Sequence, residues 1–192
     1  MSRKRYLFFC VLVLVFIILG DYTDGLWSNP NYEHGSTIIQ TLNYYYNINK
    51  SNTKLDELIY QVKTNNAYLV FYKDNYNLLN IALLKKRWNS RWKVLAKKRG
   101  ISLENTLPNI WNLNESKTTW QWTHLKNGNI QIPIFYGVIY SNDVNKIIVN
   151  NEEATIIRKN DFNIWFSIQE YTNNYDIKIY NSSTQVIEKY PK

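Results

Sequence analysis

Cysteine is almost absent from this 192-residue sequence, because Cys10 is the only one. Cys10 lies inside an apolar run, so the part of the chain after residue 20 has no cysteine. A disulfide framework, a thiolate nucleophile and a cysteine-based zinc site are therefore excluded from that part. The sequence also lacks a glycine-rich phosphate loop, a nucleophile elbow and any metal-ligand spacing, which lowers the expectation of an enzyme.

Histidine is nearly as scarce, with two in the whole chain. Any histidine-based catalysis or zinc binding would have to use His34 or His124. We interpret His34 as a linker residue, because its surroundings are polar. His124 has the same parity as Trp120 and Trp122, so in a strand the three side chains would share one face. The favoured interpretation is an aromatic face with a partly buried histidine, and a hydrolase that uses His124 is the remote alternative.

The longest apolar run covers residues 6–19, with three cations in residues 3–5 and two acids in residues 21–24. This charge distribution predicts a cytoplasmic N-terminus and an extracytoplasmic remainder. The run has fourteen residues, fewer than the roughly 20 that span a bilayer, and its length also suits a cleaved signal peptide. Ile18 nevertheless stands where a cleavage site prefers a small side chain. We therefore expect a retained single-pass anchor in the cell membrane.

The sequence predicts three parts: a signal-anchor over residues 1–20, a juxtamembrane tether over residues 21–35, and one extracytoplasmic domain over residues 36–192. The exported part is long enough to bury one core. Its twenty Lys and Arg exceed its fifteen Asp and Glu only slightly. This balance suits solubility near anionic surfaces and does not require nucleic acid, which we do not expect as a partner.

The early part of the domain is predicted to contain one amphipathic helix. Its apolar positions follow the i, i+3, i+4, i+7 pattern and are Leu55, Leu58, Ile59 and Val62. Residues 51–53 offer N-caps, and acids at residues 56–57 favour a first helical turn. The preceding segment, residues 37–46, is apolar and aromatic enough for either a helix or a strand.

From Ala67 onwards the hydrophobic period changes to two, which predicts short strands separated by Asn, Asp, Gly and Ser turns. The predicted strands cover residues 68–72, 78–86, 91–97, 118–125, 130–140, 146–149, 155–158, 162–169, 176–180 and 185–189. Asn127-Gly128 suits a type I′ turn with two positive φ angles. The fold class that follows is α+β: an N-terminal transmembrane helix, then a mostly antiparallel β domain with one early helix.

Four segments of the C-terminal half occur in an order known from other proteins. They are residues 132–139 (Ile-Pro-Ile-Phe-Tyr-Gly-Val-Ile), 147–149 (Ile-Ile-Val), 154–157 (Ala-Thr-Ile-Ile) and 164–166 (Ile-Trp-Phe). In this order they resemble strands of small, uncharacterised membrane-anchored proteins of Bacillus-type Gram-positive bacteria. The resemblance covers roughly residues 67–190. It implies an extracytoplasmic location and a β-rich fold, and it brings no known active site.

The most unusual local feature is a basic segment, residues 85–99, which holds eight cations and no acid. As a helix, it would set an apolar stripe against the cations, as in a membrane-surface segment. As a hairpin turning at Asn89-Ser90, it would place one apolar set on a single face, namely Ile81, Leu83, Trp92, Val94 and Ala96. The strand-like run from Leu78 and the turn dipeptide favour the hairpin.

As a binding surface, this segment would take an anionic envelope polymer, such as teichoic acid, lipid head groups or nucleic acid phosphates. Lys and Arg neutralise phosphate, and Trp sits at interfaces. The candidate binding residues are Lys85, Lys86, Arg87, Trp88, Arg91, Lys93, Lys97, Lys98 and Arg99. The favoured interpretation is instead a solvated edge hairpin whose lysines discourage aggregation, and binding is the alternative.

Three tryptophans are candidates for an aromatic surface. Trp120 and Trp122 would line a groove, although core packing is the default for such residues. Trp165 is out of phase with the apolar alternation of residues 162–168, so it is expected in an exposed or second-layer position. No catalytic residue, metal ligand or cofactor is predicted. The expected protein is a membrane-anchored cell-envelope protein with a non-enzymatic interaction domain.

Overall fold

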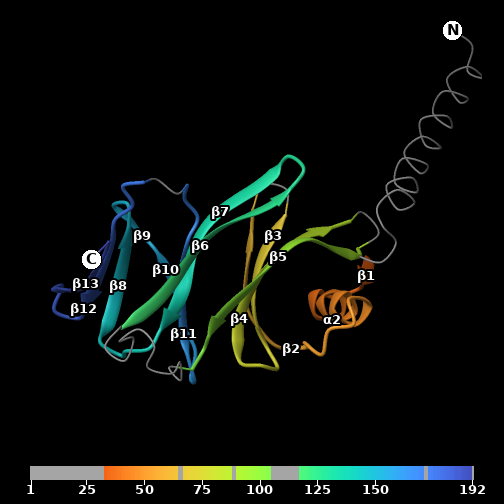
Figure 1. The fold of residues 1–192 in the computed structure, drawn as a ribbon, viewed down its shortest axis with the longest axis horizontal. Helices are drawn as coiled ribbons and strands as arrows, with labels where there is room; N and C mark the ends of the chain where they lie inside the picture. Colours follow the sequence, from red (N-terminus) through yellow and green to blue (C-terminus); the bar gives the residue numbers. More distant parts are fainter. Residues whose placement is uncertain (1–32, 65–66, 88–89, 105–116, 171–172, 192) are drawn as a thin grey trace, which may run out of the picture.

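The computed structural model describes residues 33–64, 67–87, 90–104, 117–170 and 173–191. These residues form one α-helix and thirteen strands (Figure 1). In chain order the elements are β1 (Glu33–Gly35), α2 (Ile38–Ile48), β2 (Leu55–Lys63), β3 (Tyr68–Asp74), β4 (Leu78–Lys86), β5 (Trp92–Ser102), β6 (Thr118–Asn127), β7 (Ile130–Ile139), β8 (Val144–Val149), β9 (Glu152–Glu153), β10 (Thr155–Arg158), β11 (Asn163–Ser167), β12 (Ile177–Asn181) and β13 (Val186–Tyr190).

The strands form three antiparallel sheets. Sheet A has the order β1-β5-β4-β3-β2, sheet B has β10-β11-β7-β6, and sheet C has β13-β12-β8-β9. The helix α2 covers one face of sheet A, sheet B packs on its other face, and sheet C packs on the far side of sheet B. The molecule is long in this stacking direction, with α2 and β1 at one end and sheet C with the C-terminus at the other (Figure 1).

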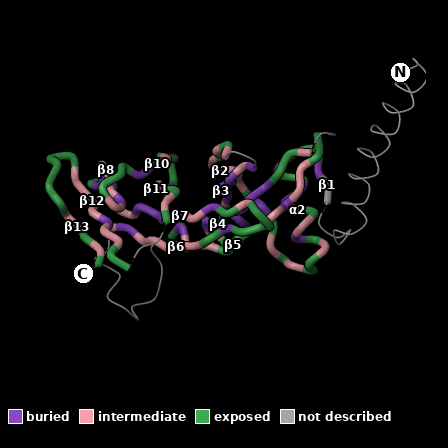
Figure 2. Tube along the Cα trace, turned by 90° about the horizontal axis from the view of Figure 1, so that it is seen from above, coloured by how far each residue is buried: buried purple, intermediate pink, exposed green. Residues whose placement is uncertain are grey.

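Three hydrophobic cores fill the spaces between these layers, because neighbouring residues of a strand point to opposite faces. The helix core lies between α2 and sheet A and includes Ile38, Leu42, Tyr46, Val70, Tyr72, Ala82, Leu84 and Val94. The A–B core includes Leu69, Phe71, Ile81, Leu83, Ile134, Tyr136, Val138, Ile164 and Phe166. The B–C core includes Phe135, Ile139, Val144, Ile147, Val149, Trp165, Ile177 and Ile179. Figure 2 shows the buried positions along the strands in the middle of the molecule.

Residues 55–62 form the edge strand β2, so the prediction of a helix there is wrong. The ladder between β2 and β3 has irregularities between Leu55 and Glu57 and between Leu58 and Tyr60. Because of these shifts, Leu55 and Leu58 face the helix core, whereas Ile59 and Val62 face the A–B core. The helix-like spacing therefore arises from an irregular strand that serves two cores.

The helix of the fold is α2, which resolves the open alternative for residues 37–46. Thr37 caps its N-terminus by accepting a hydrogen bond of 3.2 Å from the Gln40 backbone N–H. The buried positions of the helix recur at three- and four-residue spacing and are Ile38, Thr41, Leu42 and Tyr46. This stripe packs α2 onto sheet A.

The strands predicted from residue 68 onwards are confirmed, and the coarse prediction of a mostly antiparallel β fold with one helix is also confirmed. In the two-residue hairpin between β6 and β7, only Gly128 has a positive φ, of 56°. That pattern belongs to a type II′ turn, which has Gly at its first central position, so type I′ was wrong.

Residues 33–35 were expected in the tether, but they form β1 and pair with β5. His34 thus belongs to a strand rather than to a linker. The expected anchor, residues 6–19, lies outside the described residues. Within the described part of the chain, no helix has the length and apolar character to cross a membrane.

Candidate functional site

The basic segment forms an antiparallel hairpin, which confirms that alternative and excludes the helix for its described residues. Strands β4 and β5 pair from Leu78–Ser102 to Lys86–Trp92. The connection is closed by the Arg87 N–H, which donates to the Arg91 carbonyl oxygen at 2.7 Å. The predicted binding residue Trp88 lies outside the described residues.

One irregularity in the hairpin changes its predicted faces. Leu83 opposes Ala96, but the adjacent Leu84 opposes Val94, so one residue of β5 between these partners has none. Trp92 and Val94 therefore pack with Leu84 in the helix core, and only the other members of the predicted face contact the A–B core. The single apolar face expected for this hairpin is wrong.

Five cations lie at the closed end of the hairpin, which we name the basic tip: Lys85, Lys86, Arg87, Arg91 and Lys93. Lys85 and Lys93 are direct cross-strand partners. Like charges placed directly opposite each other destabilise a sheet. On the other side of Lys93, β1 sets Glu33 at the opposing position of the ladder. The tip therefore places five cations near one acidic position of β1.

Lys85 and Lys86 are both exposed. Among the described residues, neither forms an ion pair with a carboxylate. The Lys86 Nζ lies 5.8 Å from the centre of the Trp92 ring. Trp92 in turn packs edge-on against Tyr68, with the ring centres 4.9 Å apart. The tip thus combines available ammonium groups with a half-buried indole, a pairing that attracts anions and suits an interface.

The remaining cations of the segment, Lys97, Lys98 and Arg99, form a second group that we name the basic base. The Lys97 Nζ lies 4.2 Å from the ring of Tyr46 and 4.8 Å from that of Tyr45, in the last turns of α2. Burial, and then the nearby Arg99, lower the pKa of Lys97. Lys97 therefore stabilises the packing of α2 on sheet A through cation–π contacts with these two rings.

Beneath the basic base lies a buried polar group. The hydroxyl oxygens of Tyr46 and Tyr72 are 2.7 Å apart. Burial raises the pKa of both phenols, and that of Tyr72 most. Asp74 is buried and accepts hydrogen bonds from the Tyr76 N–H at 3.0 Å and from the Asn80 amide at 3.0 Å. These contacts hold the β3–β4 turn, and the protonated phenols are unsuited to act as general bases near neutral pH.

The tryptophan candidates mostly pack between sheets. The Trp120 ring lies 5.1 Å from that of Tyr175 and 5.8 Å from that of Tyr190, centre to centre. Trp165 is fully buried and donates from Nε1 to the Thr119 carbonyl oxygen at 3.3 Å. Of the two positions expected for Trp165, the second-layer position is therefore confirmed, and Trp165 is not part of an exposed aromatic surface.

His124 is exposed on the edge strand β6. Its ring centre lies 5.2 Å from that of Trp122, so the predicted shared aromatic face is confirmed for these two. The His124 Nε2 lies 3.4 Å from a carboxylate oxygen of Glu170, and this ion pair needs a protonated imidazole. Within the described ranges, no group of three His, Cys, Asp or Glu side chains could hold a metal ion. The contacts of His124 with the Trp122 ring and the Glu170 carboxylate provide an orienting carboxylate and no Ser, Thr or Cys nucleophile.

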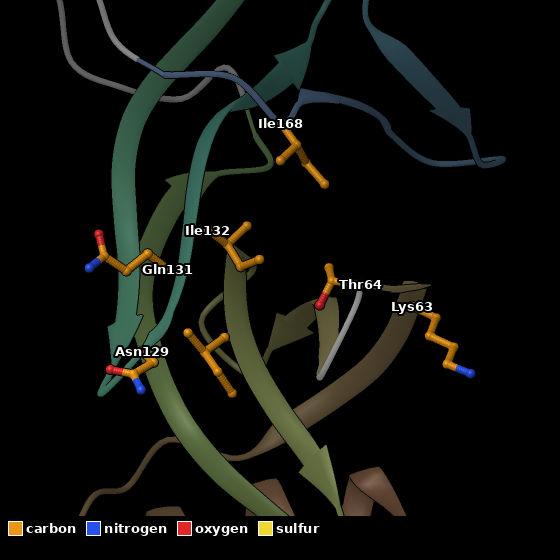
Figure 3. A pocket seen from close by; sticks show the side chains of 7 residues that line it. Lys63, Thr64, Asn129, Gln131, Ile132 and Ile168 are labelled. Atoms are coloured by element: carbon orange, nitrogen blue, oxygen red, sulfur yellow. The ribbon is translucent and has the colours of Figure 1, made fainter.

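An open hollow of about 400 Å³ lies where the end of β2, the β6–β7 hairpin and the segment after β11 meet (Figure 3). Its lining residues are Lys63, Thr64, Asn129, Ile130, Gln131, Ile132 and Ile168. Ile132 and Ile168 point toward the space, whereas the Lys63 amine points away from it. The alternation of residues 162–168 predicts Ile168 on the buried face of its strand, which is wrong, because β11 ends at Ser167 and Ile168 is exposed. The hollow itself was not predictable from the sequence, because its walls come from three distant segments. The lining offers no pairing of a nucleophile with a base.

Comparisons with protein-family models, with curated proteins and with solved structures found no match. The choice among candidate sites therefore depends on geometry and charge. The basic tip is the best candidate, because it gathers five cations at one end of the β4–β5 hairpin.

Proposed function

We propose that the protein is a non-enzymatic interaction module of the cell envelope, anchored through residues 6–19, and that its basic tip binds phosphate-bearing envelope components. The anchor, the extracytoplasmic location and the lack of catalysis are parts of this proposal. The observation that supports it most is that Lys85 and Lys86 are exposed at the closed end of the hairpin and have no carboxylate partner among the described residues. A bound phosphate would accept charge-assisted hydrogen bonds from these two ammonium groups.

The position of the hairpin within sheet A argues against the alternative of an edge whose lysines prevent aggregation. Strand β4 is interior, and β5 is covered by β1 at Trp92 and Lys93. A free strand edge is the feature that protective lysines are known to block. The tip cations lie where no such edge needs protection.

The proposal is tested with the full chain in detergent and a synthetic poly(glycerol phosphate) as the probe. The tip variant carries Ala at all five positions of the basic tip. The matched control removes five cations elsewhere, through Lys126→Ala, Lys146→Ala, Lys159→Ala, Lys178→Ala and Lys189→Ala. At low salt, we expect the tip variant to bind at least about tenfold more weakly than the wild type, because Lys and Arg contacts to phosphate dominate such affinities.

The control variant is expected to keep most of the wild-type affinity, although it has lost the same charge. Equal losses in the two variants would show that net charge alone governs binding. Unchanged binding in the tip variant would remove the tip from the proposal. Circular dichroism of both variants checks that the sheets are retained.

A further inference from the structure

We propose that the phosphates bound by the basic tip are the lipid head groups of the membrane that holds the chain's own N-terminal segment. This inference rests on the proposed function and assigns one source to the phosphate. The tip would then rest on the membrane surface, and the domain would have a preferred orientation on it.

The place where the chain enters the domain supports this assignment. Strand β1 is the first described element, and it pairs with β5 at the basic tip itself, through Glu33 with Lys93 and Gly35 with Trp92. Thirteen residues lie between Leu19, at the end of the apolar run, and Glu33. A fully extended chain of this length reaches at most about 50 Å. The tip is thus the part of the domain that is tied most closely to the apolar run.

A short connection raises the local concentration of head groups around the tip. Tethered partners meet at an effective concentration set by the length of the linker, so even weak contacts become populated. The surface potential of an anionic bilayer decays within a Debye length, about 10 Å at 0.1 M salt. Only cations held against the surface are attracted by this potential. A cluster of cations where the chain enters the domain meets this condition better than cations spread over the whole domain.

The aromatic residue of the tip fits the same partner. Trp92 is half-buried in the helix core and lies beneath the Lys86 ammonium. Tryptophan and long cationic side chains together are enriched at membrane interfaces, where the ring contacts the head-group region and the charge stays in water. Binding of a soluble polymer would need only the cations of the tip and no aromatic residue.

The order of the stacked sheets then determines which end of the domain would face away from the membrane. Sheet C lies at the opposite end of the long axis from β1, and both views of the molecule agree on this arrangement (Figures 1 and 2). Its lysines, such as Lys178 and Lys189, would lie beyond the reach of the surface potential. They provide an internal reference in the same molecule.

The test uses the wild-type full chain in nanodiscs of phosphatidylcholine alone or of phosphatidylcholine mixed equally with phosphatidylglycerol. Lysines are acylated briefly with an amine-reactive ester, and mass spectrometry measures the rate for each lysine. In the anionic discs, we expect acylation of Lys85 and Lys86 to slow by about fivefold, the gain in contact expected for each cation at an anionic surface. High salt should restore the rates, while Lys178 and Lys189 should react equally in both discs.

Equal rates for Lys85 and Lys86 in the two kinds of disc would overturn the inference, as would equal protection of Lys178 and Lys189. If the wild type still binds poly(glycerol phosphate) through the tip in that case, the proposed function stands and only the assignment to the chain's own membrane fails. If the wild type does not bind poly(glycerol phosphate) in the same preparation, the proposed function itself is contradicted.

Discussion

The basic tip and the basic base come from one run of sequence, yet their cations have different surroundings. At the tip, Lys85 and Lys86 are exposed and lack an ion-pair partner among the described residues. At the base, Lys97 lies over two tyrosine rings of α2. Lys97, Lys98 and Arg99 are exposed as well, so the two regions differ in their contacts: we expect Lys97 to stabilise the fold and Lys85 and Lys86 to be available to a partner.

The strand around the base should tolerate substitutions less well than the tip. Gly100, which follows the base in β5, gives the largest expected effect. A Cβ atom at this position would lie 1.2 Å from the Leu79 carbonyl oxygen. Gly100→Ala must therefore displace the β4–β5 ladder, and we expect it to lower the free energy of unfolding by about 3 kcal/mol or more. Urea denaturation measures the change, and Lys85→Ala at the tip is the control. A Gly100→Ala protein as stable as the wild type would contradict the close packing of the base.

High pH should also destabilise the fold through the helix core, which lies beneath the base. The pKa values of Tyr46 and Tyr72 are raised in the folded protein by burial. A raised folded pKa gives stability that is complete below the unfolded pKa, near 10, and that is lost as the pH rises above it. We expect the free energy of unfolding to fall from pH 10 upward, and to fall less steeply in Tyr72→Phe. The same slope in that variant and in the wild type would show that the buried phenol pair is not responsible.

Single lysine substitutions compare the two regions most closely, with smaller effects. Lys97→Ala removes a cation from two aromatic rings, so we expect a loss of about 0.5–1 kcal/mol in the free energy of unfolding. Lys85→Ala removes one member of a like-charge cross-strand pair, so we expect no loss and a gain of up to about 0.5 kcal/mol. Thermal and urea unfolding of both variants at low salt tests this difference in sign. Equal losses in the free energy of unfolding of the two variants would contradict the difference between tip and base.

The sequence was most informative where the hydrophobic period of two continues without interruption. The alternation of Phe162, Ile164 and Phe166 predicted β11 and its buried face, which the A–B core confirms. The hairpin of the basic segment was also predictable, because the apolar run from Leu78 leads into a turn dipeptide. The cations of the tip followed directly from their concentration in residues 85–99.

Irregular ladders account for the main errors. In β2, two register shifts convert an alternating strand into a helix-like pattern, so Leu55 to Val62 suggested the wrong element. In the hairpin, one shift moves Trp92 and Val94 to the opposite face. Such shifts depend on partners in other strands, and a single sequence does not display them. The pairing of β1 with the tip was hidden for a related reason, since three residues are too few to show a period.

The claim that the tip binds phosphate and the base does not is tested most directly by the salt dependence of poly(glycerol phosphate) binding. Two variants of equal charge are compared with the wild type: Lys85→Ala with Lys86→Ala and Lys93→Ala, and Lys97→Ala with Lys98→Ala and Arg99→Ala. Each phosphate contact contributes about 0.7 to the slope of log affinity against log salt for a flexible polyanion. We predict that the tip variant loses roughly 2 units of slope and that the base variant keeps the wild-type slope. Equal reductions in both variants, or a larger reduction in the base variant, would contradict the account.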